Sequence, residues 1–244
     1  MKHIDTHYGQ VRLGTDEEIY ASMLGFIEDA VLSRSRDLAT IGLSGGSTPK
    51  AFYRWCIEED TVSSLLAAQC LWATSDERDV PIGSEESNFG SAKRMFLDYL
   101  NIPKKTHYWP WPTILEPQEA AKNFNHQWEE HCGRDVCFDL CFLGMGPDCH
   151  TASLFPGCPL IGSGLEDNFA ATEWPGRGWR LTITEAGLMR SKRIVIAVTG
   201  ASKAEALHAV LHGDFNPKEK PAQVLKPMAE HVVWLVDETA GSQL

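Results

Sequence analysis

The sequence has no apolar stretch long enough to cross a membrane and no excess of basic residues. Its 244 residues include 33 acidic and 22 basic side chains, so the formal net charge is −11. A membrane-spanning helix needs about 20 consecutive apolar residues. The first ten residues, MKHIDTHYGQ, also lack the apolar core of a secretory signal. We therefore expect a soluble, cytoplasmic protein whose partner is neither a membrane nor a nucleic acid.

Paired cysteine motifs are missing as well. The seven cysteines are odd in number, and no two of them have CxxC spacing. A chain of this length can bury a sufficient core without disulfides, and no zinc-ligand spacing is present. We expect free thiols, no metal and no cofactor. The sequence does not indicate the oligomeric state, so a monomer and a dimer both remain open.

Internal repeats and long linkers are absent too, so residues 1–244 are expected to form a single domain. Short apolar runs alternate with amphipathic segments, which is typical of an α/β protein with a mostly parallel sheet. The expected strands are Ala39–Leu43, Cys70–Thr74, Phe138–Leu143, Arg193–Val198 and Val232–Val236. The expected helices cover about Thr15–Ser33, a segment that starts near Pro49, and about Asn88–Leu100, Gln118–His131 and Lys203–Leu211. In such sheets ligands bind at the loops after the carboxyl ends of the strands.

The first loop at an expected strand end is Ser44-Gly45-Gly46-Ser47-Thr48-Pro49. Its glycines allow close approach of a ligand to the backbone, and Pro49 suits the first position of a helix. Free amides at that helix start, together with the Ser47 and Thr48 hydroxyls, would hold a phosphate or another anion. A tight turn before a capped helix explains the same residues, and the GxxxxGK[ST] pattern of nucleotide-binding loops is absent.

Charged residues follow other strands. Asp76-Glu77-Arg78 comes directly after Cys70–Thr74 and would normally indicate a solvated turn. At this edge of the sheet, however, a carboxylate suits sugar hydroxyls and a guanidinium suits phosphate. Arg180 opens a strand-like run, and Lys203 lies at the start of a helix, where the helix dipole disfavours a cation unless an anion is also bound.

A histidine follows the third strand. His150 comes after the glycine-rich turn Gly144–Gly146 and is two residues from Asp148. Histidine is the side chain best suited to general-base catalysis near neutral pH. Asp148 would orient His150 or bind substrate directly. The other eight histidines are expected to be surface or structural residues.

Taken together, the loops resemble the 6-phosphogluconolactonase family, which shares a fold group with glucosamine-6-phosphate deaminases and ribose-5-phosphate isomerases. The matching stretches are IGLSGGSTPK, ATSDERDVP with SNFG, FDLCFLGMGPDCHTASLFPG, and RLTIT with GASK and PAQVL. They run in the family's order from about Ile41 to Leu225. The resemblance implies a Rossmann-like sheet with helices on both faces. It also implies hydrolysis of 6-phospho-glucono-1,5-lactone to 6-phosphogluconate in the pentose phosphate pathway.

On this resemblance His150 is expected to be the general base that activates water, with Asp148 as the second catalytic residue. The expected substrate-binding residues are Gly45, Gly46, Ser47, Asp76, Arg78, Arg180 and Lys203. Which cation binds the phosphate and which polarises the lactone carbonyl stays open.

One residue departs from the family pattern. The family has Asp-Gly-His where this chain has Asp148-Cys149-His150. A cysteine at this position would strain a left-handed backbone by about 1–2 kcal/mol or crowd the sugar, and it would be harmless if the backbone is ordinary. The segment from Ala171 to Trp179 also matches no family signature.

Two other functions remain as alternatives. A sugar-phosphate isomerase or deaminase of the same fold would use Asp76 as the proton-transferring base and His150 in ring opening. The TASLFP stretch after His150 favours the lactonases instead. A non-catalytic sugar-phosphate sensor is the third possibility, although no basic DNA-binding extension is present.

Overall fold

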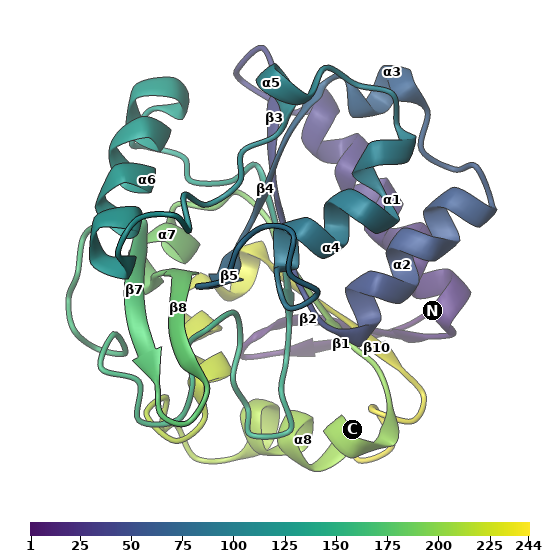
Figure 1. Ribbon diagram of the computed structural model, residues 1–244. Coiled ribbons are helices and arrows are strands. Elements are labelled where there is room, and N and C mark those ends of the chain that lie inside the picture. Colours follow the sequence, from purple (N-terminus) through teal and green to yellow (C-terminus); the bar gives the residue numbers. More distant parts are fainter.

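Seven strands form one sheet in the computed structural model, which describes all 244 residues (Figure 1). The strand order is β1-β2-β10-β9-β6-β3-β4, and every neighbouring pair is parallel except β1 with β2. The strands are β1 Lys2–Thr6, β2 Gly9–Gly14, β3 Ala39–Leu43, β4 Cys70–Thr74, β6 Leu140–Gly144, β9 Ile194–Val198 and β10 Val232–Asp237. The expectation of a mostly parallel α/β sheet is confirmed.

A second sheet lies beside the first and was not expected. It contains three antiparallel strands in the order β5-β8-β7. These strands are β5 Asp76–Arg78, β7 Phe169–Trp174 and β8 Gly178–Ile183. The three charged residues of β5 have no strand pattern of their own, because pairing with β8 and burial by neighbouring segments hold them extended. The prediction of a strand-like run starting at Arg180 falls within β8.

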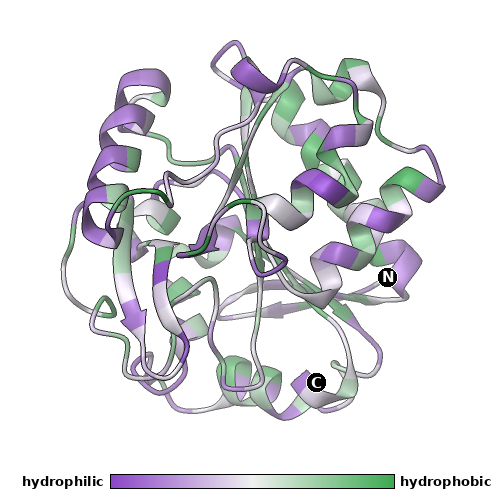
Figure 2. Ribbon diagram, viewed as in Figure 1, coloured by the Kyte–Doolittle hydropathy of each residue, from purple (hydrophilic) through white to green (hydrophobic).

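The core occupies both faces of the large sheet because side chains alternate along each strand. In β9, Ile194 and Ile196 belong to one buried cluster, whereas Val195 and Ala197 belong to the other. Strand β10 alternates in the same way. The helices have one hydrophobic side and one hydrophilic side, as the hydropathy colouring shows (Figure 2). Two-sided burial explains why these strands read as continuous apolar runs.

Helices cover both faces, as the resemblance implied. The longer ones are α1 Asp16–Leu32, α2 Ser47–Glu58, α4 Asn88–Met95, α6 Pro117–Cys132 and α8 Ala204–His212. The shorter ones are α3 Ser64–Ala67, α5 Lys104–His107, α7 Glu185–Met189 and the 3₁₀ helices η1 Leu97–Tyr99, η2 Ala201–Lys203 and η3 Pro221–His231. Residues of α1, α2 and α4 pack in one cluster, and those of α6 and α8 pack in the other. No helix has the length and hydropathy that a membrane crossing requires.

Local backbone geometry and capping set three of the helix boundaries. A capping box formed by Thr15 and Glu18 starts α1, at the beginning of the predicted helix. The expected helix Asn88–Leu100 is instead split into α4 and η1, because the backbone at Phe96 has φ −142° and ψ −65°. Helix α2 begins at Ser47, so Pro49 is its third residue and not the first.

Strand order determines where a ligand can bind. From β3 the chain moves outward to β4, and then passes to β6, β9 and β10 on the other side. The order therefore reverses between β3 and β6, and the loops after these two strands diverge to leave a crevice at their carboxyl ends. These loops are Ser44–Pro49 and the turn that leads to His150.

Candidate functional site

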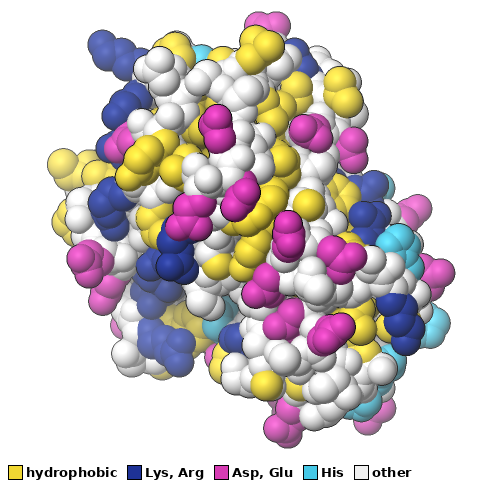
Figure 3. Space-filling model, turned by 90° about the vertical axis from the view of Figure 1, so that its right-hand side faces the viewer, with side chains coloured by type: hydrophobic (Ala, Val, Ile, Leu, Met, Phe, Trp, Pro, Cys, Tyr) yellow, Lys and Arg dark blue, Asp and Glu magenta, His cyan; other side chains and the backbone are white.

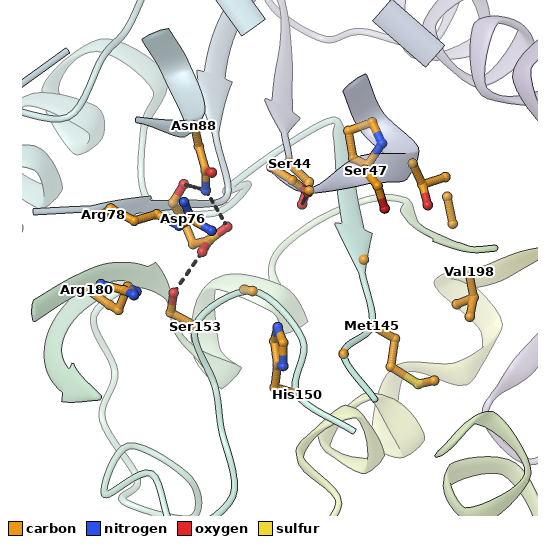
Figure 4. Close-up of a pocket in the computed structure, with 18 of the residues that line it drawn as sticks. Ser44, Ser47, Asp76, Arg78, Asn88, Met145, His150, Ser153, Arg180 and Val198 are labelled. Atoms are coloured by element: carbon orange, nitrogen blue, oxygen red, sulfur yellow. Dashed lines mark hydrogen bonds between the residues drawn. The ribbon is translucent and has the colours of Figure 1, made fainter. Parts of the chain in front are cut away.

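A cavity of about 260 Å³ opens at this reversal point. It is lined by the loop after β3, the turn after β6, the end of β9 and the three-stranded sheet. In Figure 4, His150 lies below Ser44 and Ser47, and Arg78 and Arg180 lie to its left, on the three-stranded sheet. Nine residues predicted for the site come from five separate segments, and all of them except Asp148 line the cavity.

His150 and Asp148 form a hydrogen-bonded pair. The distance between His150 Nδ1 and Asp148 Oδ1 is 2.5 Å, and both side chains are partly exposed. Burial opposes ionisation of Asp148, but the hydrogen bond and charge of His150 outweigh it, so the pKa of Asp148 falls to about 2. Asp148 is therefore a carboxylate at neutral pH. Its hydrogen bond to Nδ1 fixes the ring and leaves Nε2 of His150 without a protein partner.

The turn that carries this pair is tightly folded. Gly146 N donates to the carbonyl oxygen of His150 at 2.9 Å, and Cys149 N donates to that of Gly146 at 3.0 Å. A Cβ atom on Gly146 would overlap both the His150 ring and the Asp148 carboxylate. Glycine at this position is thus a requirement of the pair itself, because any side chain would displace it.

The cysteine that replaces the family glycine takes a left-handed conformation, with φ 64°. Its side chain is buried in the core, and Sγ lies 3.7 Å from the carbonyl oxygen of Ala206. Cys149 does not line the cavity, so crowding of the sugar does not occur. The first of the three expectations for this position, backbone strain, therefore holds. Burial also raises the pKa of Cys149, which argues against a thiolate nucleophile.

The start of α2 presents backbone groups to the cavity. Gly46 has φ 102°, which favours glycine, and no side chain caps the first amides of the helix. Unpaired amides and the helix dipole make this end suitable for an anion. The Thr48 hydroxyl is already engaged with the hydroxyl of Thr199 at 2.7 Å, which leaves Ser47 as the hydroxyl available to a ligand.

The Asp76-Glu77-Arg78 triplet divides between two roles because alternate residues of β5 face opposite ways. Asp76 and Arg78 line the cavity. Glu77 is buried and accepts hydrogen bonds from Ser87 Oγ and from the amides of Arg78, Asn88 and Phe89, at 2.6 to 3.0 Å. It thereby fastens the start of α4 to the small sheet. Burial outweighs these hydrogen bonds and raises the pKa of Glu77.

Two further predicted cations reach the cavity. Arg180 lies directly opposite Arg78 in the β5–β8 pair. Burial, followed by the charge of Arg78, lowers the pKa of Arg180. Lys203 is the N-cap residue of α8, as expected, and burial lowers its pKa although the charge of Asp148 opposes the shift. In one view of the surface, acidic side chains are scattered across the face, and many of the Lys and Arg side chains lie along the left edge (Figure 3).

The structure adds residues that sequence reasoning did not assign. Asn88 Nδ2 donates to Asp76 Oδ1 at 3.3 Å, and Ser153 Oγ donates to Asp76 Oδ2 at 2.7 Å (Figure 4). Both residues lie in stretches that carried the family resemblance. Trp174 and Arg177 also line the cavity, and no signal in the sequence pointed to them. No three His, Cys, Asp or Glu side chains meet in an arrangement that could hold a metal ion.

A parallel α/β sheet, a histidine–aspartate pair and a cavity lined by cations define an enzyme class that acts on anionic small molecules. The family model "Glucosamine-6-phosphate isomerases/6-phosphogluconolactonase" matches residues 15–234. The chain belongs to this family.

Individual relatives agree with this assignment. A 6-phosphogluconolactonase from Synechocystis sp. is 34% identical over 220 residues, and the match covers 86% of each chain. The solved structure of a 6-phosphogluconolactonase from Trypanosoma cruzi superimposes with a TM-score of 0.84 at 21% identity, covering 100% of this chain and 99% of the other. A monomeric glucosamine-6-phosphate deaminase gives a TM-score of 0.79 at 18% identity, covering 96% and 99%. These two structures share the fold, so overall shape does not separate the two activities.

Proposed function

We propose that this chain hydrolyses 6-phospho-glucono-1,5-lactone to 6-phosphogluconate in the oxidative pentose phosphate pathway. The observation that carries the proposal is the His150–Asp148 pair, set within a cation-lined cavity in a chain 34% identical to a lactonase. The seven free and buried cysteines suit a reducing compartment, so we place the activity in the cytoplasm.

In this mechanism His150 acts on water. Asp148 holds Nδ1, so Nε2 removes a proton as the water oxygen bonds to C1 of the lactone. The bond between C1 and the ring oxygen then breaks, and His150 returns the proton to that oxygen, which leaves as an alcohol. General-base catalysis of this kind contributes about 10²- to 10⁴-fold in rate. The charge of Asp148 stabilises the protonated ring between the two steps.

Substrate binding depends on the surrounding groups. Gly45, Gly46 and Ser47 would hold the phosphate through the start of α2, together with Arg78, Arg180 and Lys203. Asp76 would accept a sugar hydroxyl. Because Ser153 and Asn88 already hold its two oxygens, Asp76 is better suited to this fixed role than to shuttling a proton, as an isomerase or deaminase would require.

A coupled assay tests the proposal. Glucose-6-phosphate dehydrogenase generates the lactone in situ, and excess 6-phosphogluconate dehydrogenase reports the product. We expect wild-type turnover well above spontaneous hydrolysis, a loss of about 10²-fold or more in His150→Ala, and no loss in His126→Ala. His126 is exposed on α6 and lies outside the cavity, which makes it a matched control.

Two results would contradict the proposal. Release of ammonia from glucosamine 6-phosphate, without lactone hydrolysis, would assign the chain to the deaminases. Binding of 6-phosphogluconate with no turnover of either compound would indicate a sensor.

A further inference from the structure

The tip of the β7–β8 hairpin holds an arginine in a fixed place at the cavity. Arg177 N donates to the carbonyl oxygen of Trp174 at 2.8 Å, across a turn whose central residues are Pro175 and Gly176. Gly176 has φ 74°, as the second central residue of a type II turn requires. The hairpin tip is therefore a defined turn, and it brings the exposed Arg177 side chain to the cavity lining.

Trp174 fixes the Arg177 side chain as well. The Arg177 guanidinium carbon lies 4.7 Å from the centroid of the Trp174 ring, within the range of a cation–π interaction. The ring is itself stacked on Phe155, with centroids 4.7 Å apart and an interplanar angle of 15°. It also meets the His150 ring edge-on at 4.9 Å and 75°. Trp174 thus connects the arginine at the cavity edge with the catalytic histidine.

Arg177 joins two other arginines that have no acidic partner. Arg78 and Arg180 lie directly opposite each other across an antiparallel pair, where like charges are destabilising. Neither of them, nor Arg177, forms an ion pair with a carboxylate, and their hydrogen bonds go only to main-chain oxygens: Arg78 to Glu86 and Arg180 to Trp179. Burial lowers the pKa of Arg180, and the charges of Arg78 and Arg177 lower it further, although the charges of Asp76 and Glu86 oppose the shift. The guanidinium carbons of Arg177 and Arg180 lie 4.7 and 5.9 Å from the centroid of the Trp174 ring, and Arg78 is paired with Arg180. Three guanidinium groups with free donors therefore line the same part of the cavity.

We propose that Arg177 is a further substrate-binding residue, which completes a three-arginine site for the phosphate group of the sugar lactone. Trp174 is its positioning residue. This inference rests on the proposed function for the identity of the substrate. Each guanidinium group can donate two parallel hydrogen bonds to a pair of phosphate oxygens. Three guanidinium groups therefore suit a phosphate dianion better than a neutral carbonyl. Arg177 is exposed at the rim of the cavity, where it would contact the phosphate, a group that is charged before the reaction begins. Arg177 therefore contributes to substrate binding more than to the chemical step.

The first test compares two substrates. Arg177→Gln should raise KM for the phosphorylated lactone about tenfold, the scale of one lost charged hydrogen bond, with kcat changed less than twofold. Its kcat/KM for unphosphorylated glucono-1,5-lactone should equal that of the wild type. The KM of Arg177→Lys for the phosphorylated lactone should lie between the values of the wild type and Arg177→Gln. Lysine keeps the positive charge but cannot form two parallel hydrogen bonds to the phosphate. Arg134→Gln is the control, because Arg134 is an exposed arginine outside the cavity that pairs with Glu129. An unchanged KM, or equal losses on both lactones, would overturn the inference.

The second test does not need turnover. Calorimetry should show 6-phosphogluconate binding about tenfold more weakly to Arg177→Gln than to wild type, with the weak binding of gluconate unchanged. If the wild type binds 6-phosphogluconate but hydrolyses no lactone, the proposed function fails while this inference stands. If Arg177→Gln binds 6-phosphogluconate as tightly as the wild type, the inference fails whatever the activity.

Trp174 provides a third readout. Trp174→Ala should reproduce the higher KM of Arg177→Gln and also lower kcat, because His150 loses its aromatic neighbour. Trp174→Phe retains an aromatic face and should restore kcat. If Trp174→Ala only lowers the melting temperature and leaves KM unchanged, Trp174 does not position Arg177.

Discussion

The loops of the seven-stranded sheet shape the cavity mainly through main-chain geometry and add one cation, Lys203, whereas the three-stranded sheet supplies most of the charged side chains. From the large sheet come the uncapped start of α2 and the tight turn that holds His150 against Asp148. From the small sheet come Asp76, Arg78 and Arg180. The difference predicts how substitutions should affect activity. Added side-chain volume should do most harm in the loops of the large sheet, and loss of a charged side chain should do most harm in the small sheet.

The strongest test of the first half of this comparison is Gly146→Ala. The added methyl would overlap the His150 ring and the Asp148 carboxylate, so the proposed base would move away from the position that the proposed mechanism requires. We expect kcat to fall about 10²- to 10⁴-fold, as in the loss of a general base, with the far-UV circular dichroism unchanged. Gly25→Ala on α1, where nothing lies within 4 Å of the new Cβ, should retain full activity. Full activity in Gly146→Ala would refute the role assigned to the turn.

Glu77 tests the second half through stability. Glu77→Ala would leave four donors around β5 and the start of α4 without their acceptor. The unfolding free energy should fall by about 3 kcal/mol, measured by urea denaturation. Glu85→Ala, an exposed glutamate on the segment between β5 and α4, should cost less than about 0.5 kcal/mol. Equal effects of the two substitutions would mean that the carboxylate does not hold the small sheet in place.

Cys149→Gly separates strain from crowding. Glycine would relieve the left-handed backbone by about 1 kcal/mol, but it would also remove the buried thiol from the core. These effects oppose each other, so we expect stability to change by less than about 1 kcal/mol and kcat to stay the same. Asp60→Gly, at an exposed residue with φ 48°, measures strain relief alone. A tenfold rise in kcat for Cys149→Gly would show that the thiol does reach the substrate.

The smallest effect concerns pH. The pKa of Glu77 is raised by burial, so the native state holds this proton at pH values where the unfolded chain has released it. The stability from protonation is complete below the unfolded value of about 4.3 and is lost as pH rises through the higher native value. Between pH 4 and pH 8, the unfolding free energy of the wild type should therefore fall relative to that of Glu77→Gln, as urea titrations at each pH would show. A difference that moves the other way would mean that the hydrogen bonds outweigh burial.

The same contrast explains what could be predicted from the sequence. The strands of the large sheet are buried on both sides, so β3 and β4 were predicted with their observed bounds. The loops after them follow from parallel topology, which is why His150 and the Ser44–Pro49 loop were found. Residues of the small sheet depend on contacts between distant segments. Asp76 meets Ser153 across 77 positions, and Trp174 meets Phe155 and His150 only after folding.

The placement of the cysteines has a consequence for chemical durability. All seven are free and buried, and burial raises the pKa of Cys56, Cys70 and Cys132 to about 12. Peroxides and disulfide reagents attack exposed thiolates, and all seven sulfurs belong to buried residues. The folded protein should therefore keep its activity when the redox balance around it turns oxidising, whereas the unfolded chain, with its thiols exposed, depends on the reducing compartment proposed above.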